Sequence, residues 1–495
     1  MLNKLRNIGK ESAVYGLGNV LNKLLGFILI PLYNNHISID DFGILSIFEI
    51  SIMFLSVVLN FGIHIAHQRF FYIEKNNGTY GKFLFNCFVG NLLLAFTAIL
   101  PLLIFSNHLS GTFFDSQNQT ANMQIALWII LIEVLYNYPL QILQFESKPF
   151  QFLLLNAFKL ILSFGLTIYL VKNFAMGING ILNARLAGAL LSLLFALFIV
   201  IIPKWVMRFD FKVVLNAIRF GFPLIISTIA TTVFLLSDRY MLKWLSTDAE
   251  VGKYGFGLKI ANFINLIFIQ TIGLSYFPSV MKSEGAEDNT RYYRKMLTYY
   301  CFLIALIILS FLFFYRDILS LIVKNKDYWE GLNVVPFLSL SFMIMGMNYF
   351  VGVGLFLSKK TNYYIVPSFM AAVINFCSNF LLIPRYGMIG AGISVILAQI
   401  VYTSILSYLA GRQLKIGFEW KKVFSIYAIA FLIFFGDRFL TTQINSIVIL
   451  YFARVLLLGF FVLILYKFNF FEPIEIQRFF EGLQKLLKRF KLVKP

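Results

Sequence analysis

Basic side chains stand inside long apolar runs of this chain, where a charge needs either water or a partner. Lys23 and Lys159 lie near the middle of two runs that are long enough to cross a bilayer. A charge at that depth costs about 2.5–3.5 kcal/mol on insertion scales, and a lysine there cannot easily reach the interface by snorkelling. Two interpretations stay open. The lysines line a wet cationic cavity that attracts an anion, or they pair with a buried acid such as Glu133.

Other candidate charges have a structural interpretation beside the functional one. Glu133 is central in its run and is either an ion-pair partner or a proton-binding site. Arg185 and Lys259 lie within two helical turns of a run's end, where snorkelling alone would explain them. Asp238 and Arg239 are adjacent at the end of another run, as an interfacial pair or as a gate. The sequence alone leaves these alternatives open.

Two further arginines lie in or next to the apolar runs. Arg69 follows the second apolar run, where it either retains its loop in the cytoplasm or makes the first contact with an anionic ligand. Arg454 lies in the last run and is interpreted as structural. The cavity hypothesis therefore assigns ligand binding to six basic residues and ion coupling or ion pairing to two acids. The basic set is Lys23, Arg69, Lys159, Arg185, Arg239 and Lys259, and the acids are Glu133 and Asp238.

The elements that carry these charges are predicted to be membrane-spanning helices. Of the 495 residues 59% are hydrophobic and only 13% are charged, whereas soluble domains are about 25% charged. A spanning helix needs about 20 apolar residues, and fourteen such runs can be counted. They cover 13–33, 43–66, 83–105, 121–145, 150–171, 178–202, 215–237, 254–278, 297–315, 332–357, 363–384, 387–410, 421–440 and 446–467. The predicted fold is all-α and polytopic.

The basic residues also predict the orientation. The five residues at either end of a span are counted with the adjoining loop. Of the 42 Lys and Arg residues, 28 then fall in the termini and one alternating set of loops, nine fall in the other set, and five fall deeper inside spans. Loops rich in Lys and Arg stay in the cytoplasm. Both termini are therefore predicted to be cytoplasmic, and the even number of spans agrees with this.

The chain resembles itself at a displacement of roughly 210 residues. ISIDDFG ends at Gly43 after the first span, and STDAEVGKY places Gly252 at the corresponding point after the seventh. FAMGINGI (174–181) likewise aligns with YGMIGAGI (386–393). With six spans in each repeat, both halves enter the membrane with the same polarity, which is the plan of a parallel-repeat transporter.

Four segments follow from the repeat. We predict a six-helix bundle over 1–212, a second over 213–412, and two appended helices within 413–470. The tail at 471–495 has apolar residues at helical spacing with Lys and Arg between them, which predicts an amphipathic helix lying on anionic lipid in the cytoplasm.

Several function classes are disfavoured. The net charge of +19 would indicate nucleic-acid binding only on a folded soluble surface, and no stretch of the chain predicts one. There is no nucleotide-binding loop, metal-ligand spacing or nucleophile motif. We therefore expect a transporter rather than an enzyme, with no cofactor and no metal.

Seven stretches, in order along the chain, resemble the polysaccharide repeat-unit flippases of the multidrug/oligosaccharidyl-lipid/polysaccharide exporter superfamily. Lys23 stands where that family usually has Arg or Lys, and Arg69 stands at its basic position at the end of the second span. The stretches are NKLLGFILIPLY (22–33), ISIDDFGILS (37–46), NFGIHIAHQRFF (60–71), RFGFPLIISTI (219–229), LLSDRYML (235–242), EVGKYGFGLKIANF (250–263) and RYGMIGAGIS (385–394).

The resemblance implies two six-helix bundles and two extra helices around a cationic cavity. It also implies alternating-access transport of an undecaprenyl-pyrophosphate-linked oligosaccharide across the bacterial cytoplasmic membrane, for O-antigen, capsule or exopolysaccharide. Membrane lipid and a polysaccharide polymerase or other assembly proteins are the partners it implies.

Three rival functions stay open. A multidrug or cation exporter on the same fold would prefer acids deep in its cleft, whereas the deep charges here are mostly basic. A membrane polymerase or ligase usually has a large outer loop, and every predicted outer loop here is short. A flippase for the peptidoglycan precursor is separated only weakly by the sequence.

Overall fold

Long apolar helices make up the part of the chain that the structure describes. The computed structural model describes residues 28–114, 117–146, 148–273, 276, 280, 289–358, 360–444, 446–467 and 470. No strand occurs among these residues, and eleven of their helices are long and apolar enough to cross a membrane. The prediction of an all-α polytopic membrane protein is confirmed. Lys23, most of the first predicted span and the amphipathic tail at 471–495 lie outside the described residues.

The eleven helices follow the predicted spans closely. Ten of them match one predicted span each, and the stretch Asn362–Gln413 holds two. These two join at Gly387, whose φ of +52° and ψ of −132° break the helical path inside α16 (Ile365–Gln413). A glycine adopts positive φ without the steric cost that a side chain would bring. The seventh predicted span lies within α10 (Phe211–Leu245), a helix of 35 residues.

The chain separates into two compact units. Unit 1 comprises Met1–Thr271, Ser320–Ile344 and Thr361–Leu406, and unit 2 comprises Ile272–Leu319, Met345–Lys360 and Ser407–Pro495. All the described candidate charges of the cavity hypothesis belong to unit 1. The division at 212/213 between two six-helix bundles stays a prediction.

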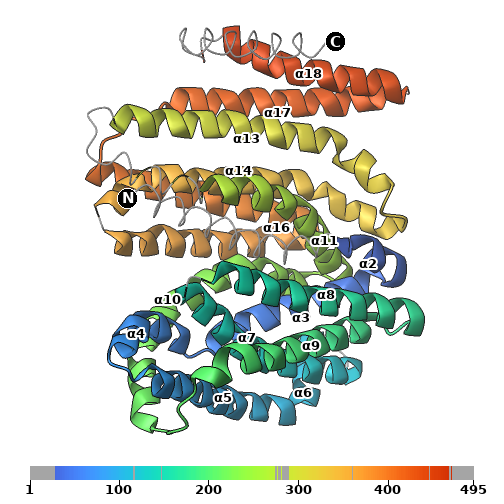
Figure 1. The fold of residues 1–495 in the computed structure, drawn as a ribbon. Coiled ribbons are helices and arrows are strands. Elements are labelled where there is room, and N and C mark those ends of the chain that lie inside the picture. The colour runs from blue at the N-terminus through green and yellow to red at the C-terminus, as the bar shows by residue number, and fades with distance from the viewer. Residues whose placement is uncertain are drawn as a thin grey trace, which may run out of the picture. The chain divides into compact units, whose positions relative to one another are not determined.

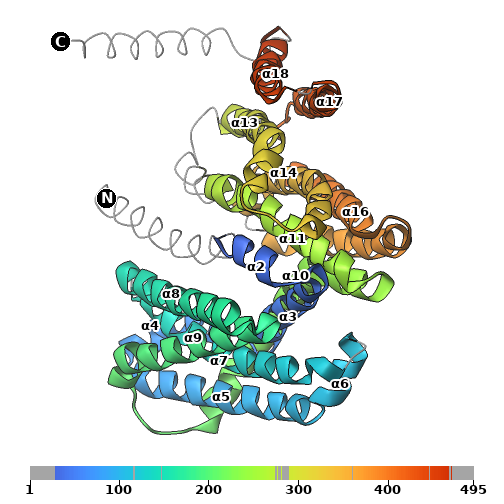
Figure 2. The same cartoon turned by 90° about the vertical axis from the view of Figure 1, so that its right-hand side faces the viewer.

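Unit 1 contains the helices of the first six spans and several later ones. They are α2 (Ile30–His36), α3 (Ile39–Val58), α4 (Ile63–Asn76), α5 (Tyr80–Ile104), α6 (Ser106–Phe114), α7 (Thr120–Phe145), α8 (Pro149–Phe174), α9 (Gly177–Ala196), α10, α11 (Asp248–Ile264), the 3₁₀ helix η5 (Lys326–Asn333), the first part of α14 (Val335–Val351) and most of α16. Helices α7, α8 and α9 lie side by side in this unit (Figure 2).

Two helices of unit 1 begin in the same way. The Ser38 hydroxyl caps α3 by accepting a hydrogen bond from the Asp41 amide at 3.1 Å, and the Thr247 hydroxyl caps α11 by accepting one from the Glu250 amide at 3.3 Å. Each helix also carries two acids in its first turn, where they complement the helix dipole. These caps occupy corresponding positions in the predicted repeat.

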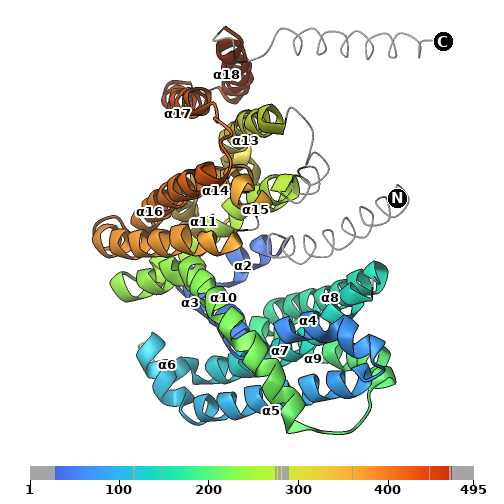
Figure 3. The same cartoon turned by 90° about the vertical axis from the view of Figure 1, so that its left-hand side faces the viewer.

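Close helix crossings hold unit 1 together. α10 crosses both α3 and α4 (Figure 3), and at one crossing Gly62, with φ of +76°, lies against the backbone of Gly221 so closely that a Cβ on either would overlap the other. Small residues permit such approaches between membrane helices.

Unit 2 contains α13 (Asn289–Ser320), the end of α14, α15 (Val353–Leu357), α17 (Trp420–Gln443) and α18 (Ile447–Lys467). α17 and α18 run alongside each other (Figure 1). Arg454 on α18 is buried and forms ion pairs with Asp437 on α17 at 2.9 Å and with Asp317 on α13 at 2.5 Å. One arginine therefore joins three helices of this unit.

Candidate functional site

One carboxylate in unit 1 forms ion pairs with two basic side chains from neighbouring helices. The Oε2 atom of Glu133 on α7 lies 2.8 Å from the Lys159 ammonium on α8, and its Oε1 atom lies 3.2 Å from the Arg185 guanidinium on α9. The Lys159 ammonium also lies 4.7 Å from the centre of the Tyr136 ring, a distance at which a cation is attracted to an aromatic face. The three charged side chains together carry one excess positive charge.

A glycine positions this group. A Cβ at Gly188 of α9 would overlap the Ser163 hydroxyl of α8, so the two helices approach each other there. Arg185 and Lys159 lie about one turn from this crossing on their own helices, which brings both to Glu133. The Arg185 side chain is 33% exposed against 17% for Glu133, so the arginine is the accessible member.

A second ion pair lies between α3 and α11. The Lys259 ammonium is 3.0 Å from the Oε1 atom of Glu49 and lies 5.0 Å and 4.8 Å from the ring centres of Tyr33 and Phe42. Glu49 is the acid that sequence reasoning missed, although it is the sole charged residue in the predicted span 43–66. The depth argument applied to Glu133 would have found it.

The two ion pairs belong to one electrostatic group. The Glu49 carboxylate interacts electrostatically with Arg185 and Arg239 as well as with Lys259. We call the six residues Glu49, Glu133, Lys159, Arg185, Arg239 and Lys259 the charged cluster. It contains four basic and two acidic side chains within unit 1, which leaves an excess of positive charge. Such a group is suited to attracting an anion in a medium of low dielectric constant.

The charged cluster is covered at one end by aromatic rings. Phe42, Phe256 and Tyr328 surround one another, with ring centres 5.2 to 6.4 Å apart. The Tyr328 hydroxyl donates a hydrogen bond to the Ile37 carbonyl at 3.0 Å, which ties η5 to the start of α3. This end of unit 1 is the one that the sequence predicts to face outward.

Asp238 has neutral partners. It is buried on α10, and its oxygens accept hydrogen bonds from the Tyr254 hydroxyl at 3.1 Å and from the Asn379 amide at 2.8 Å. The Asn379 amide also donates to Asn375 at 3.0 Å. A buried carboxylate held by amide and hydroxyl donors can bind a proton or a cation, and it lies next to Arg239 of the charged cluster.

The other predicted residues lie apart from this cluster or beyond the described chain. Arg69 is exposed on α4. Among the described residues, the contacts that hold the charged cluster together do not involve Arg69. Lys23 lies outside the described residues. Within the described ranges no group of three His, Cys, Asp or Glu residues is placed to hold a metal ion.

A family model described as "Polysaccharide biosynthesis protein" matches residues 8–284, which is more than half of the chain. The chain belongs to the polysaccharide biosynthesis protein family. This places it in the multidrug/oligosaccharidyl-lipid/polysaccharide exporter superfamily, as the sequence motifs predicted.

Other proteins are similar to this chain over most of its length. An uncharacterised membrane protein of Methanocaldococcus jannaschii is 22% identical over 97% of this chain and 99% of its own length. The fold of this polysaccharide biosynthesis protein is similar to that of the lipid II flippase MurJ in an inward closed conformation, with a TM-score of 0.74 and 15% identity over 92% of this chain and 99% of that one. It is also similar to an inward-facing multidrug resistance transporter of the MATE family, with a TM-score of 0.56 and 16% identity over 81% and 94% of the two chains.

Proposed function

We propose that this protein is a flippase that moves oligosaccharide repeat units linked to undecaprenyl pyrophosphate across the bacterial cytoplasmic membrane. The observation that carries the proposal is the charged cluster, in which Lys159, Arg185, Arg239 and Lys259 outnumber Glu49 and Glu133 inside the membrane helices. A pyrophosphate head group is the anion that this family's substrates would present. The protein acts as a transporter and not as an enzyme in this proposal.

The ion pairs of the charged cluster suit transient binding of an anionic cargo. Lys159 and Lys259 each contact a carboxylate through a single close pair, and Arg185 approaches Glu133 with its Nη2 atom at 3.2 Å and its Nε atom at 3.4 Å. Lysine acts as a point charge, whereas a short two-bond arginine clamp holds a phosphate more rigidly. Cations already paired with protein carboxylates can exchange those partners for the cargo and then recover them, so the cargo is bound and released.

The orientation follows the positive-inside prediction. With cytoplasmic termini, the α3–α11 contact and the aromatic rings around Phe42 close the outer end of unit 1, so the structure corresponds to a state closed to the outside. Alternating access then requires α3 and α11 to separate. The cargo would be released outward for a polymerase or other assembly protein to use in building O-antigen, capsule or exopolysaccharide.

Energy for the cycle is proposed to enter through Asp238. Its hydrogen bonds from Tyr254 and Asn379 link α10, α11 and α16 of unit 1. Binding of a proton or a cation would change these hydrogen bonds and therefore the fit of the three helices. Glu133 is the alternative coupling residue, but its two ion pairs favour a role in balancing the basic side chains.

A second candidate cargo is the peptidoglycan lipid precursor. The observation that favours it is the similarity to the lipid II flippase, which covers 92% of this chain at a TM-score of 0.74. Both cargoes have a polyprenyl pyrophosphate and differ in the glycan. A multidrug or cation exporter is less favoured, because the excess charge of the cluster is positive.

The deciding experiment is deletion of the gene followed by leaflet-resolved detection of lipid-linked glycans. Accumulation of oligosaccharide repeat units on the inner leaflet supports the proposal, and accumulation of lipid II assigns the second candidate. Unchanged lipid distribution together with lost drug efflux would overturn both.

Point variants test the charged cluster in the same assay. Lys259→Gln should lose most of the complementing activity and Lys259→Arg should retain more, because only the second keeps the charge. Lys172→Gln is the matched control, since Lys172 is an exposed lysine on α8 outside the cluster. Replacement of Lys23 by Glu should abolish complementation as well, and full activity of that variant would remove Lys23 from the binding set.

A further inference from the structure

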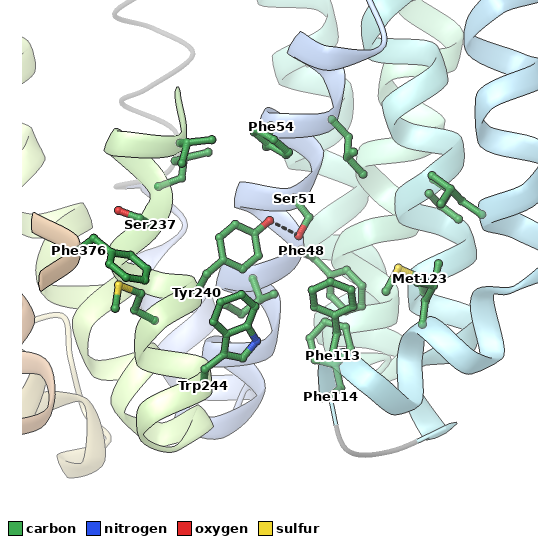
Figure 4. A pocket seen from close by; sticks show the side chains of 18 residues that line it. Phe48, Ser51, Phe54, Phe113, Phe114, Met123, Ser237, Tyr240, Trp244 and Phe376 are labelled. Atoms are coloured by element: carbon green, nitrogen blue, oxygen red, sulfur yellow. Dashed lines mark hydrogen bonds between the residues drawn. The ribbon is translucent and has the colours of Figure 1, made fainter. Parts of the chain in front are cut away.

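An apolar pocket of about 490 Å³ lies within unit 1 and is open on one side. Helices α3, α5, α6, α7, α10 and α16 all contribute to its wall (Figure 4). Seven of the lining side chains are aromatic. These are Phe48, Phe54, Phe113, Phe114, Tyr240, Trp244 and Phe376.

The three hydroxyl groups in the wall are bonded to protein partners. The Ser51 hydroxyl on α3 and the Tyr240 hydroxyl on α10 form a hydrogen bond with each other at 2.8 Å (Figure 4). The Ser237 hydroxyl donates to the Asn375 side-chain oxygen at 3.1 Å. The pocket therefore presents hydrocarbon and ring surfaces to an occupant, and a purely apolar cavity binds apolar molecules rather than water.

Two aromatic residues of the pocket wall are exposed. Trp244 is 68% exposed and Phe376 is 56% exposed, and both line the pocket. Trp244 is the penultimate residue of α10, and tryptophan near a helix end is typical of the membrane interface. We therefore expect the exposed part of the pocket wall at Trp244 to face lipid near one membrane interface.

The pocket lies next to the charged cluster on the same two helices. On α3, Glu49 directly follows Phe48 of the pocket wall, and on α10, Arg239 directly precedes Tyr240. Successive residues of a helix point about 100° apart, so one face of each helix carries the charge and the adjacent face lines the pocket. The Ser51–Tyr240 hydrogen bond joins the two helices.

We propose that this pocket binds part of the isoprenoid chain of the lipid-linked cargo while the charged cluster holds its pyrophosphate. The inference rests on the proposed function and adds a tail site to it. Since an apolar cavity of about 150 Å³ accommodates one benzene, 490 Å³ corresponds to roughly twenty carbons, or about four isoprene units. Continuity with the cluster favours the cargo's own tail over the acyl chain of an unrelated phospholipid.

The test uses the purified full-length protein with four probes: undecaprenyl pyrophosphate, undecaprenol, inorganic pyrophosphate and phosphatidylglycerol. Leu127→Trp and Met241→Trp each fill the pocket, and Leu127→Phe is the milder alternative. Leu432→Trp is the matched control, because Leu432 is 70% exposed on α17. Thermal unfolding without ligand identifies any variant that does not fold, and the milder variant then takes its place.

We expect the filled pocket to weaken binding of undecaprenyl pyrophosphate and undecaprenol by about ten-fold, the loss expected when one side chain's worth of apolar contact is removed. Binding of inorganic pyrophosphate should stay within about two-fold of wild type, because the charged cluster is intact. If wild-type protein binds undecaprenol but not pyrophosphate, the anion site fails and the tail site stands. Unchanged isoprenoid binding in the filled variants, or a selective loss of phosphatidylglycerol, would overturn the proposal.

Discussion

Gly43 on α3 lies against α11, and Gly252 on α11 lies against α3 in the same way. A Cβ on Gly43 would overlap the carbonyl of Asp248, four residues before Gly252, and a Cβ on Gly252 would overlap the carbonyl of Ile39, four residues before Gly43. The two glycines also correspond in the predicted repeat. A contact that is the same from both sides is what a two-fold axis between two repeats would produce, and it supports the proposed pairing of two bundles.

This contact predicts that neither glycine tolerates a side chain. In Gly43→Ala or Gly252→Ala the methyl group meets backbone, which cannot rotate away, so α3 and α11 must move apart at a cost of roughly 1–3 kcal/mol. We expect a lower melting temperature and a large loss of flipping in both variants. Gly165→Ala is the control, because nothing lies within 4 Å of a Cβ there. If all three variants behave alike, the α3–α11 contact is not a closure of the outer end.

Glu133→Gln tests whether the carboxylate competes with the cargo. The amide removes the carboxylate that pairs with Lys159 and Arg185, so binding of inorganic pyrophosphate should become tighter. The free energy of unfolding should fall by roughly 1–3 kcal/mol. This is less than for a fully buried ion pair, because the Arg185 side chain is a third exposed. Calorimetry and thermal unfolding of the purified protein measure the two effects.

The double variant Glu133→Gln/Lys159→Gln measures how much the Glu133–Lys159 ion pair contributes to stability. It removes one charge of each sign, so its stability should recover part of the loss seen in Glu133→Gln, and with Lys159→Gln as the third variant the cycle gives the coupling of the pair. Weaker pyrophosphate binding in Glu133→Gln would contradict competition and would indicate that the carboxylate itself takes part in binding or coupling.

The sequence predicted the spans because hydrophobicity and length are local properties. It also identified Glu133 and Lys159, by their depth, as charges that require a partner or water, and it named Arg185, Arg239 and Lys259 as candidates nearer the ends of their spans. Which acid meets which base could not be predicted, because Glu133 and Arg185 are 52 residues apart and meet only through the packing of α7 against α9. The choice between a cavity and an ion pair depends on that packing.

Two other features show where sequence reasoning ends. Glu49 was within reach of the same depth argument, and the omission came from weighing the basic residues alone. The apolar pocket was not predictable, since six helices contribute to its wall and each lining residue alone resembles ordinary lipid-facing or core sequence. Cavities depend on how side chains fill the space between helices, which no local pattern encodes.

The ion pairs of Glu146 predict that the protein loses stability at acid pH. It follows α7 and forms ion pairs with Lys148 at 2.9 Å and Lys204 at 2.6 Å. Burial would raise the pKa of the Glu146 carboxyl, but the hydrogen bonds and charges of the two lysines outweigh it and hold the pKa below its ordinary value. A lowered pKa stabilises the fold above the ordinary value of about 4.3, and this stabilisation is lost as the pH falls through the native value.

Thermal unfolding between neutral pH and pH of about 3 measures this effect. The melting temperature of wild type should fall more steeply at the acid end than that of Glu146→Gln, which has no carboxyl to protonate at this position. Parallel curves for the two proteins would mean that the ion pairs around Glu146 add nothing to stability.

Arg454 predicts the largest stability effect in unit 2. Its guanidinium is buried between Asp437 and Asp317, and these ion pairs connect α18 to α17 and α13. Arg454→Gln removes the charge that pairs with both carboxylates, and the cost of about 3–5 kcal/mol for removing one partner of a fully buried pair is an upper bound here, because the Asp317 side chain is 40% exposed. We expect this variant to express poorly and to melt well below wild type, while Arg454→Lys, which keeps the charge but loses the forked geometry, should lie between them.

The triple variant Asp317→Asn/Asp437→Asn/Arg454→Gln distinguishes a structural role from a functional one. Asn matches Asp in size and Gln is smaller than Arg, and together the three changes remove the charges of Asp317, Asp437 and Arg454, so the penalty of an unpaired buried charge disappears and the melting temperature should return toward wild type. If the arginine only joins the three helices, flipping returns with stability. Recovered stability without flipping would instead show that the charge itself takes part in the transport cycle, and the structural interpretation of Arg454 would be wrong.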